Sequence, residues 1–319
     1  MGKRQIRMFI SSTLLDMQQD RDFLVKHVFP DMRKECERRG VFWSEVDLRW
    51  GVNTDQLTLE DEIAHDEIVL QHCLREIDKC DLFIGLLGER YGTVPQTFPA
   101  ALRQTSLKPE DYIGHSITEL EILYGALQAE TTARQSFFYF RDPEYYKQLA
   151  PEEQAQYFEQ LETYLEIYDG QSAAARVAAQ KKQLADLKKR LQHAAKRKQV
   201  GLEHDVYQNQ AELKAYVQED ILAYINQRFP AEQELGSFER ERLEHHYYSQ
   251  RYCRYYQPLD DIQKKLTDFG HSGKQGFLLA GESGSGKSTI LANWLQSFQP
   301  DENTRVLTHF VGANQNSSD

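Results

Sequence analysis

The stretch Asp81-Leu-Phe-Ile-Gly-Leu-Leu87 decides the fold class, because it is a short and continuous apolar run. Such a run is typical of a strand that is buried on both faces of a parallel sheet. Three further runs rich in β-forming residues lie at 5–10, 41–48 and 136–140. Helical patterns separate these runs, over about 14–39, 59–79 and 116–129. Strands that alternate with helices predict parallel β-α-β units and hence an α/β fold.

The composition limits the classes of protein to which the chain can belong. The 319 residues include 38 Lys and Arg against 49 Asp and Glu, which gives a net charge of −11. A general nucleic-acid coat needs a positive surface, so we do not expect nucleic acid as a partner. The sequence has no apolar run near the roughly 18 residues of a membrane helix and no apolar signal segment at its start. We therefore expect a cytoplasmic protein with no membrane partner, whose four scattered cysteines are thiols.

Residues 144–200 differ in character from the strand-and-helix pattern that precedes them. An acidic helical pattern begins at Pro151 and stops at Gly170, and a basic helical pattern follows it. Residues 181–198 carry eight basic side chains against Asp186 alone. Two helices of opposite charge joined at a glycine predict an antiparallel helical hairpin inserted into the domain. Its simplest role is a solvated spacer, and binding of nucleic acid or an acidic partner by the basic helix is the alternative.

The remaining pattern divides the chain into a first domain, a linker and a second domain. An amphipathic helix over 206–229 ends before Pro230 and closes the first domain, which we place at 1–230. Residues 231–270 form a linker that carries His245 and His246 among many aromatic residues. These two histidines lack a third ligand at a spacing typical of metal sites. Residues 271–319 begin a second domain.

The strongest chemical signal lies in this second domain. A short strand, 276–280, leads into Gly281-Glu-Ser-Gly-Ser-Gly-Lys-Ser-Thr289 and then into a helical pattern. Strand, glycine-rich loop and helix are the required setting of a P-loop, which binds ATP with Mg²⁺. The residues expected to hold the nucleotide are Gly281, Gly284, Gly286, Lys287, Ser288 and Thr289. Backbone N–H groups would cradle the phosphates, Lys287 would neutralise their charge, and Ser288 would ligate Mg²⁺.

A second strand is expected over 305–311. About 45 residues beyond Gly276 cannot complete the sheet of a P-loop ATPase or supply its later acidic Mg²⁺ partner. We therefore expect 271–319 to be the N-terminal portion of such a domain, with poor hydrolysis on its own.

The motifs resemble a known arrangement of two domains. Gly281–Thr289 followed by His309-Phe-Val-Gly312 resembles the start of the NACHT domain of STAND signalling ATPases. The N-terminal part resembles the TIR-like domain of unknown function that precedes such NACHT modules in telomerase-associated, nephrocystin-like and bacterial antiphage STAND proteins. The matching stretches are Phe9-Ile-Ser-Ser-Thr13, Val46-Asp-Leu-Arg-Trp-Gly-Val52, Gly88-Glu-Arg-Tyr-Gly92 and Ser116-Ile-Thr-Glu-Leu-Glu121.

This resemblance implies a fold and a mode of action. The first domain would be a flavodoxin-like or Rossmann-like parallel sheet. ATP exchange in the second domain would drive self-oligomerisation, in response to a trigger that a C-terminal sensor recognises, and so activate the first domain in defence or innate signalling. Enzymatic TIR domains cleave the nicotinamide–ribose bond of NAD⁺ with a helix-borne glutamate. The resemblance assigns that role to Glu121, with Glu119 as second choice and Arg90 beside them.

Ligands of parallel α/β sheets bind at the carboxyl ends of the strands. Sequence order places there the candidate binding residues Ser11, Ser12, Thr13, Asp47, Arg49 and Trp50. If the domain cleaves NAD(P)⁺, Glu121 shares a cleft with residues 11–13 and Arg90. Glu119 and Glu121 are two residues apart on a helix, so they face different directions. The alternative is a non-catalytic domain that mediates assembly, in which these polar residues are caps and ion pairs.

Overall fold

The computed structural model describes residues 4–46, 59–95, 114–127, 134–161, 170–204, 206–230, 236–253, 260–273, 275–282, 284–302 and 304–311. The chain divides into two compact units, an N-terminal unit of residues 1–231 and a C-terminal unit of residues 232–319.

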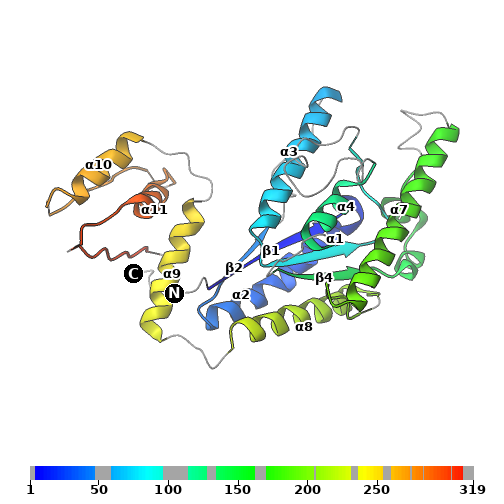
Figure 1. Cartoon of the computed structure of the whole chain (residues 1–319), viewed down its shortest axis with the longest axis horizontal. Coiled ribbons are helices and arrows are strands. Elements are labelled where there is room, and N and C mark those ends of the chain that lie inside the picture. The colour runs from blue at the N-terminus through cyan, green and yellow to red at the C-terminus, as the bar shows by residue number, and fades with distance from the viewer. Residues whose placement is uncertain are drawn as a thin grey trace. The chain divides into compact units, whose positions relative to one another are not determined.

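The N-terminal unit alternates strands and helices, as the periodicity predicts (Figure 1). Its elements are β1 (Gln5–Ser12), α1 (Leu14–His27), α2 (Phe29–Arg38), β2 (Phe42–Val46), α3 (Leu59–Asp78), β3 (Leu82–Leu87), α4 (Ile117–Ile122), the π-helix η4 (Leu123–Leu127), β4 (Gln135–Phe140), the 3-10 helix η5 (Pro143–Gln148), α5 (Pro151–Gln154), the 3-10 helix η6 (Ala155–Tyr157), α7 (Gly170–Lys196) and α8 (Gln210–Arg228). The four strands form one parallel sheet in the order β2-β1-β3-β4. This is an α/β, Rossmann-like fold, so the prediction of fold class is confirmed.

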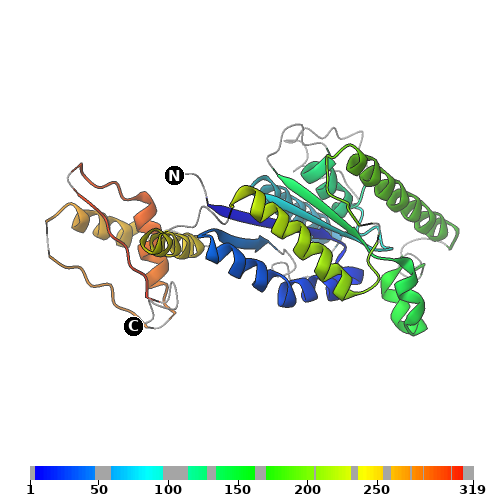
Figure 2. The ribbon, with the colours of Figure 1, turned by 90° about the horizontal axis from the view of Figure 1, so that it is seen from below.

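Two apolar cores cover the two faces of the sheet, because successive side chains of a strand point to opposite faces. On one face Met8 and Ile84 pack with residues of α1, α2 and α8. On the other face Phe9 and Phe83 pack with residues of α3, α4 and α7. Figure 2 shows α8 and α7 on opposite sides of the strands. The sheet is therefore the middle of three layers, and both central strands, β1 and β3, are buried as their apolar sequences predict.

Gly85 marks the tightest point of this packing. A Cβ atom on Gly85 would lie 2.4 Å from the ring of Phe138, its register partner on β4. Any side chain there would displace the ring, so glycine within this strand is explained by close packing.

Residues 144–200 differ from the expected inserted hairpin. The acidic half begins with the short helices α5 and η6. The helix does not continue after them, and Phe158 instead forms an isolated parallel β-bridge with Glu89. The basic half is the long helix α7, which starts at Gly170, the residue where the acidic helix was expected to stop. Its apolar face, with Leu184, Leu187 and Leu191, is buried in the second core. Each buried leucine contributes about 1.5–3 kcal/mol, so α7 is an integral layer of the fold and not a spacer.

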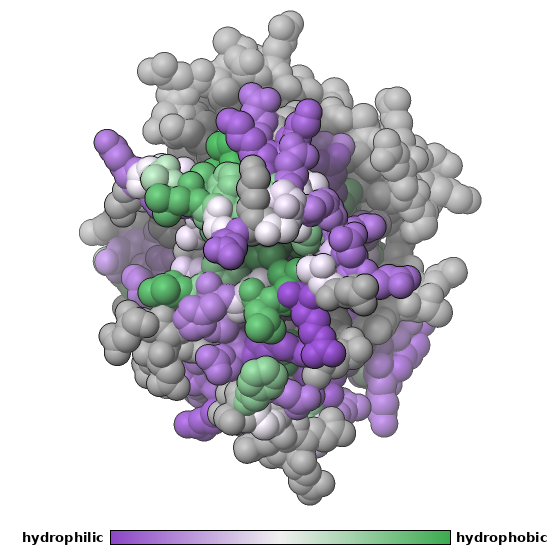
Figure 3. Space-filling model, turned by 90° about the vertical axis from the view of Figure 1, so that its left-hand side faces the viewer, coloured by the Kyte–Doolittle hydropathy of each residue, from purple (hydrophilic) through white to green (hydrophobic). Residues whose placement is uncertain are grey.

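The C-terminal unit contains α9 (Ser237–Cys253), α10 (Asp260–Gly270) and α11 (Lys287–Ser297). The indole N–H of Trp294 donates to Thr267 Oγ1 across 3.1 Å, which joins α11 to α10. The segments 276–280 and 305–311, expected as strands, form no strand in the structure. Leu278 and Leu307 are 89% and 92% exposed, and Figure 3 shows apolar side chains gathered on this face among polar ones. The sequence favours strands here, but a strand forms only where a neighbouring strand satisfies its backbone.

Candidate functional site

The predicted P-loop residues lie in a glycine-rich loop at the start of α11. Gly284 and Gly286 adopt φ of +80° and +81°, a conformation that glycine tolerates and other residues resist. These two turns bring the chain to the start of α11 at Lys287, with Ser288 and Thr289 in its first turn. The helix N-terminus therefore directs its free N–H groups toward the loop.

The Lys287 ammonium folds back over this loop. Its Nζ donates to the carbonyl oxygens of Gly281, at 2.9 Å, and Glu282, at 2.6 Å. These carbonyls hold the cation beside the free N–H groups of α11, where phosphate oxygens would compete for it. The helix N–H groups and the Lys287 ammonium are donors that fit phosphate, and the Ser288 hydroxyl would be the Mg²⁺ ligand.

Glu121 occupies the carboxyl edge of the sheet in the N-terminal unit. The Ser11 hydroxyl, at the end of β1, donates to Glu121 Oε2 across 2.6 Å. The thiol of Cys73 also donates to this carboxyl. Burial raises the pKa of Glu121 above its ordinary value, and these hydrogen bonds together with the charge of Arg21 oppose that rise only in part. The buried carboxyl group therefore keeps its proton to a higher pH than an exposed glutamate does.

The turns around Glu121 explain how the sequence brings it there. The Ser116 hydroxyl caps α4 by accepting from the Glu119 N–H across 3.2 Å. After Glu121 the helix widens into η4, and Gly125 sits so close to the ring of Phe83 that a Cβ would lie 2.7 Å from it. A glycine here lets the helix approach β3.

Glu119 has a different set of partners. It accepts from the Tyr91 hydroxyl and from Arg190 Nη1, the latter across 2.9 Å, and His115 Nε2 lies 3.5 Å away. Burial and the charge of Glu119 raise the pKa of Tyr91, which keeps its hydroxyl protonated as a donor. The two glutamates thus belong to separate clusters, as their two-residue spacing predicts.

Arg90 does not join Glu121 in the described part of the chain. Its Nη1 donates to the Phe158 carbonyl across 2.9 Å, and its Nη2 lies 3.5 Å from Glu159 Oε2. Glu159 also accepts from the Tyr91 N–H across 2.9 Å. Arg90 therefore joins the loop after β3 to residues 156–159. These contacts do not bring it to Glu121, where it was expected.

The other predicted binding residues fall into two groups. Ser12 and Thr13 are buried beside Ser11: the Ser12 hydroxyl accepts from Arg21 Nη1 across 2.7 Å, and the Thr13 hydroxyl donates to Asp16. These contacts connect β1 to α1. Asp47, Arg49 and Trp50 lie outside the described residues.

Sequence reasoning missed a buried charge cluster beside this edge. Arg141, which is 1% exposed, follows β4 directly. Its Nη1 lies 3.6 Å from Asp20 Oδ2, and its guanidinium lies 5.0 Å from the ring centre of Tyr157. The Tyr207 hydroxyl donates to Asp20 across 2.5 Å. One sequence feature could have predicted this cluster. Asp16 and Asp20 are one helical turn apart and lie on the same face of α1 as its core residues.

Helix α7 also reaches this edge, which the sequence did not reveal. Lys188 Nζ lies 2.8 Å from Glu89 Oε1, and Arg190 reaches Glu119 as described above. Two ion pairs therefore tie α7 to the loop after β3 and to α4. Pairs of this kind fix geometry more than they add stability.

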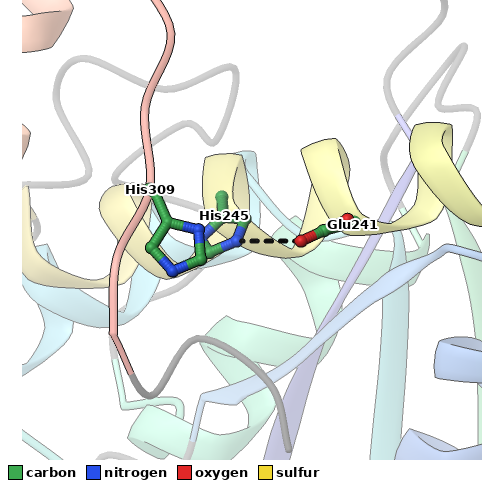
Figure 4. Close-up of side chains that lie close together, drawn as sticks. All are labelled: Glu241, His245 and His309. Carbon is green, nitrogen blue, oxygen red and sulfur yellow. Dashed lines mark ion pairs between the residues drawn. The ribbon is translucent and has the colours of Figure 1, made fainter. Parts of the chain in front are cut away.

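The C-terminal unit brings Glu241, His245 and His309 together (Figure 4), with ligand atoms within 4.8 Å of one another. His245 is 3% exposed, and its Nδ1 accepts from the Phe310 N–H across 3.0 Å. A neutral imidazole that accepts at Nδ1 carries its proton on Nε2, the nitrogen 3.9 Å from Glu241 Oε1. A metal ion would need that proton removed or the Phe310 hydrogen bond broken. The contacts therefore fit a latch between α9 and residues 304–311 better than a metal centre.

Comparison with known proteins places the N-terminal unit in a family. Residues 7–222 match the model described as "Domain of unknown function (DUF4062)". The chain belongs to the DUF4062 family. None of the helices in the described part of this DUF4062 protein combines the length and the apolar composition that crossing a membrane requires.

The relatives of this DUF4062 protein are much longer. It is 30% identical to a TPR repeat-containing protein of Dictyostelium discoideum over 99% of this chain and 20% of that protein. It is 32% identical to telomerase protein component 1 of Mus musculus over 45% of this chain, and 34% identical to NACHT and WD repeat domain-containing protein 2 of Homo sapiens over 28%, in each case 5% of the relative. The chain thus spans a fifth or less of the length of these relatives. No solved structure matches it.

Proposed function

We propose that this DUF4062 protein is the N-terminal effector part of a STAND-type signalling or defence ATPase. The observation that carries the proposal is the loop at 281–289, where two left-handed glycines lead into α11 and Lys287 is held beside the helix start. Similarity to a stretch of a NACHT-containing protein supports it. Bound ATP with Mg²⁺ would place a charged γ-phosphate in the loop, and the presence or absence of this phosphate would separate two states of the unit. The change of state promotes self-association, in response to a trigger recognised elsewhere in the protein.

Nucleotide binding is tested with a fluorescent ATP analogue in the intact protein. Lys287→Ala removes the cation that faces the phosphates, and binding should weaken at least about tenfold. Lys264→Ala, an exposed lysine of α10, is the matched control and should bind as the parent protein does. Equal binding by the Lys287 variant contradicts the proposal.

For the N-terminal unit we propose cleavage of NAD(P)⁺, with Glu121 as the catalytic carboxylate. Support comes from its place at the carboxyl edge of a parallel sheet, held by Ser11 and Cys73. The C1′–N glycosidic bond breaks, its electron pair leaves with nicotinamide, and water adds to C1′ and releases a proton. Ionised Glu121 stabilises the positive charge that develops on the ribose. Because burial raises the pKa of Glu121, assembly or substrate that brings polar groups to this carboxyl group would favour its ionised form.

A non-catalytic assembly domain is the second candidate, and one observation favours it. Glu121 is buried and its oxygens are engaged by Ser11 and Cys73, as in a structural network. The discriminating experiment incubates the assembled protein with NAD⁺ and ATP and measures released nicotinamide. Release that Glu121→Gln abolishes, with assembly retained, supports catalysis. Assembly and signalling without any nicotinamide release support the second candidate.

A further inference from the structure

Helix α7 has two faces of opposite character. Its inner face buries Leu184, Leu187 and Leu191 against the sheet. Its outer face carries Lys182, Lys189 and Lys196, all of them exposed. A spacing of seven residues is close to two helical turns, so these lysines lie on one stripe with steps of about 10.5 Å. We call Lys182, Lys189 and Lys196 the basic ridge. The helix lies at the edge of its unit (Figure 1). The ridge is on the side of α7 opposite the buried leucines, so it faces away from the sheet.

The charge of the ridge is left largely unneutralised by the described part of the chain. Lys182 and Lys196 have no side-chain partner there, and the same holds for their neighbours Lys181, Arg197 and Lys198. Lys189 has an exposed ion pair with Asp186 at 3.8 Å. By contrast, Lys188 and Arg190 turn inward to Glu89 and Glu119. Helix α7 therefore carries two sets of cations: Lys188 and Arg190 form ion pairs within the fold, and the ridge lysines face solvent.

The rest of the chain has the opposite charge. Residues 170–198 contain nine Lys and Arg and one acidic residue, a net charge of 9 − 1 = +8. The other residues contain 29 basic and 48 acidic side chains, which is 29 − 48 = −19. A second copy of this chain therefore offers the ridge a strongly complementary surface, while phosphate polymers would meet repulsion from most of the protein.

One helix carries much of that acidity. The sequence of α3, Leu59–Asp78, has seven acidic residues against the single basic Arg75. Since α3 and α7 are different elements, the contact can form twice in a two-fold pair, or once per copy in a head-to-tail arrangement. The head-to-tail arrangement would build rings or filaments, and the two-fold pair would close on itself.

We propose that the basic ridge of α7 docks on the acidic helix α3 of a second copy of this chain and forms a contact of the assembled state. This inference rests on the proposed self-association and names the surfaces that carry it. Salt bridges across a surface of this kind are individually weak and act as a set, so the contact is selective by charge and sensitive to salt.

The test compares self-association in the presence of ATP by sedimentation velocity. The ridge variant carries Lys182→Glu, Lys189→Glu and Lys196→Glu. The control variant carries Lys26→Glu, Lys34→Glu and Lys264→Glu, which are exposed lysines elsewhere and give the same change in net charge. We expect the ridge variant to associate at least about tenfold more weakly than the control. Association of the parent protein should also fall between about 50 and 500 mM NaCl, because salt screens exposed charges. Far-ultraviolet circular dichroism checks that each variant folds.

Charge exchange identifies the partner surface. A variant with Glu60→Lys and Glu67→Lys in α3 should associate poorly alone but regain association when mixed with the ridge variant. Salt-insensitive association, equal association of ridge and control variants, or failure of the mixture overturns the inference and leaves the proposed ATPase function standing. Ridge-dependent binding of a 20-nucleotide DNA with unchanged self-association also overturns it. Absence of any ATP-dependent association in the parent protein overturns both proposals.

Discussion

The hydroxyl of Ser11 donates to the carboxyl group of Glu121 across 2.6 Å, although the two residues are 110 positions apart in the chain. Ser11 is at the end of a central strand and Glu121 is on the helix that leads to β4. The contact places a protonatable group in a buried position beside the most buried strands of the sheet. Its chemistry is therefore governed by burial as much as by its partners.

The first prediction concerns the pH dependence of stability. The pKa of Glu121 is raised in the folded protein, so the folded state holds a proton that the unfolded state releases. The stabilisation that comes from this proton is fully present below the pKa of about 4.3 in the unfolded chain. It is lost as the pH rises through the pKa of Glu121 in the folded protein. Glu121→Gln stays neutral and keeps the shape of the side chain, so at pH 8 its free energy of unfolding should exceed that of the parent by about 1–3 kcal/mol.

Urea unfolding at pH 4 and pH 8 measures this effect. The difference between variant and parent should be larger at pH 8. The exposed Glu37→Gln is the control and should show a difference within about 0.5 kcal/mol at both values. A Glu121→Gln variant that is destabilised equally at both pH values contradicts the prediction.

The second prediction tests whether α7 is part of the fold. Leu191 is fully buried in the second core, and Leu191→Ala should cost about 2.5–5 kcal/mol of unfolding free energy through lost burial and the cavity it leaves. The adjacent Gln192 is exposed, and Gln192→Ala should cost less than about 0.5 kcal/mol. Thermal unfolding followed by circular dichroism compares them. A small loss for both would mean that α7 is an independent spacer.

The third prediction concerns the buried arginine after β4. Arg141→Met removes the cation that faces Asp20 and leaves a buried carboxylate without its ion pair, which should cost about 3–5 kcal/mol. Arg38→Met, on an exposed arginine of α2, provides the control. Chemical denaturation gives both free energies, and a loss under about 1 kcal/mol for Arg141→Met would show that the cluster tolerates the missing charge.

The fourth prediction concerns the latch in the C-terminal unit. Burial lowers the pKa of His245, the like charge of His309 adds to this, and Glu241 and Glu244 oppose it. Neutral His245 accepts a hydrogen bond from the Phe310 N–H. The stabilisation from the neutral form is present above the ordinary histidine pKa of about 6.5 and is lost as the pH falls through the lowered pKa of the folded protein. The Phe310 amide should therefore exchange faster with deuterium at pH 5 than at pH 8, after correction for intrinsic rates.

Two variants of the latch separate titration from packing. His245→Asn keeps an acceptor near the Nδ1 position without titrating, so its exchange should not depend on pH in this range. His246→Asn alters the neighbouring, exposed histidine and should retain the pH dependence of the parent. Unchanged protection in the parent at pH 5 would show that the hydrogen bond does not hold the segment.

Local sequence signals predicted the strands of the sheet well and the helix breaks less well. The apolar run of β3 was recognisable because both its faces are buried. The pattern over 14–39 predicted one helix, whereas the chain breaks between α1 and α2. Pro30 lacks the N–H that a continuous helix needs and sits in the first turn of α2, which explains the break.

Long-range contacts were beyond the sequence for a physical reason. Glu121 was expected beside residues 11–13, and Ser11 does contact it, but its contact with Cys73 and the separation of Arg90 depend on packing that no local pattern encodes. The role of α7 was hidden because its lysines dominate its composition, although Leu184, Leu187 and Leu191 have the spacing of a buried face. The P-loop was recognisable from spacing alone, since its chemistry is carried by consecutive residues.

Helix α8 has a practical consequence for anyone who wishes to prepare the domain in isolation. The family match ends at residue 222, in the middle of α8, while Tyr224, Ile225 and Phe229 are buried in the first core. A recombinant product trimmed at the match would expose that apolar surface and should aggregate, whereas extension beyond Phe229 keeps the last turn that covers the sheet.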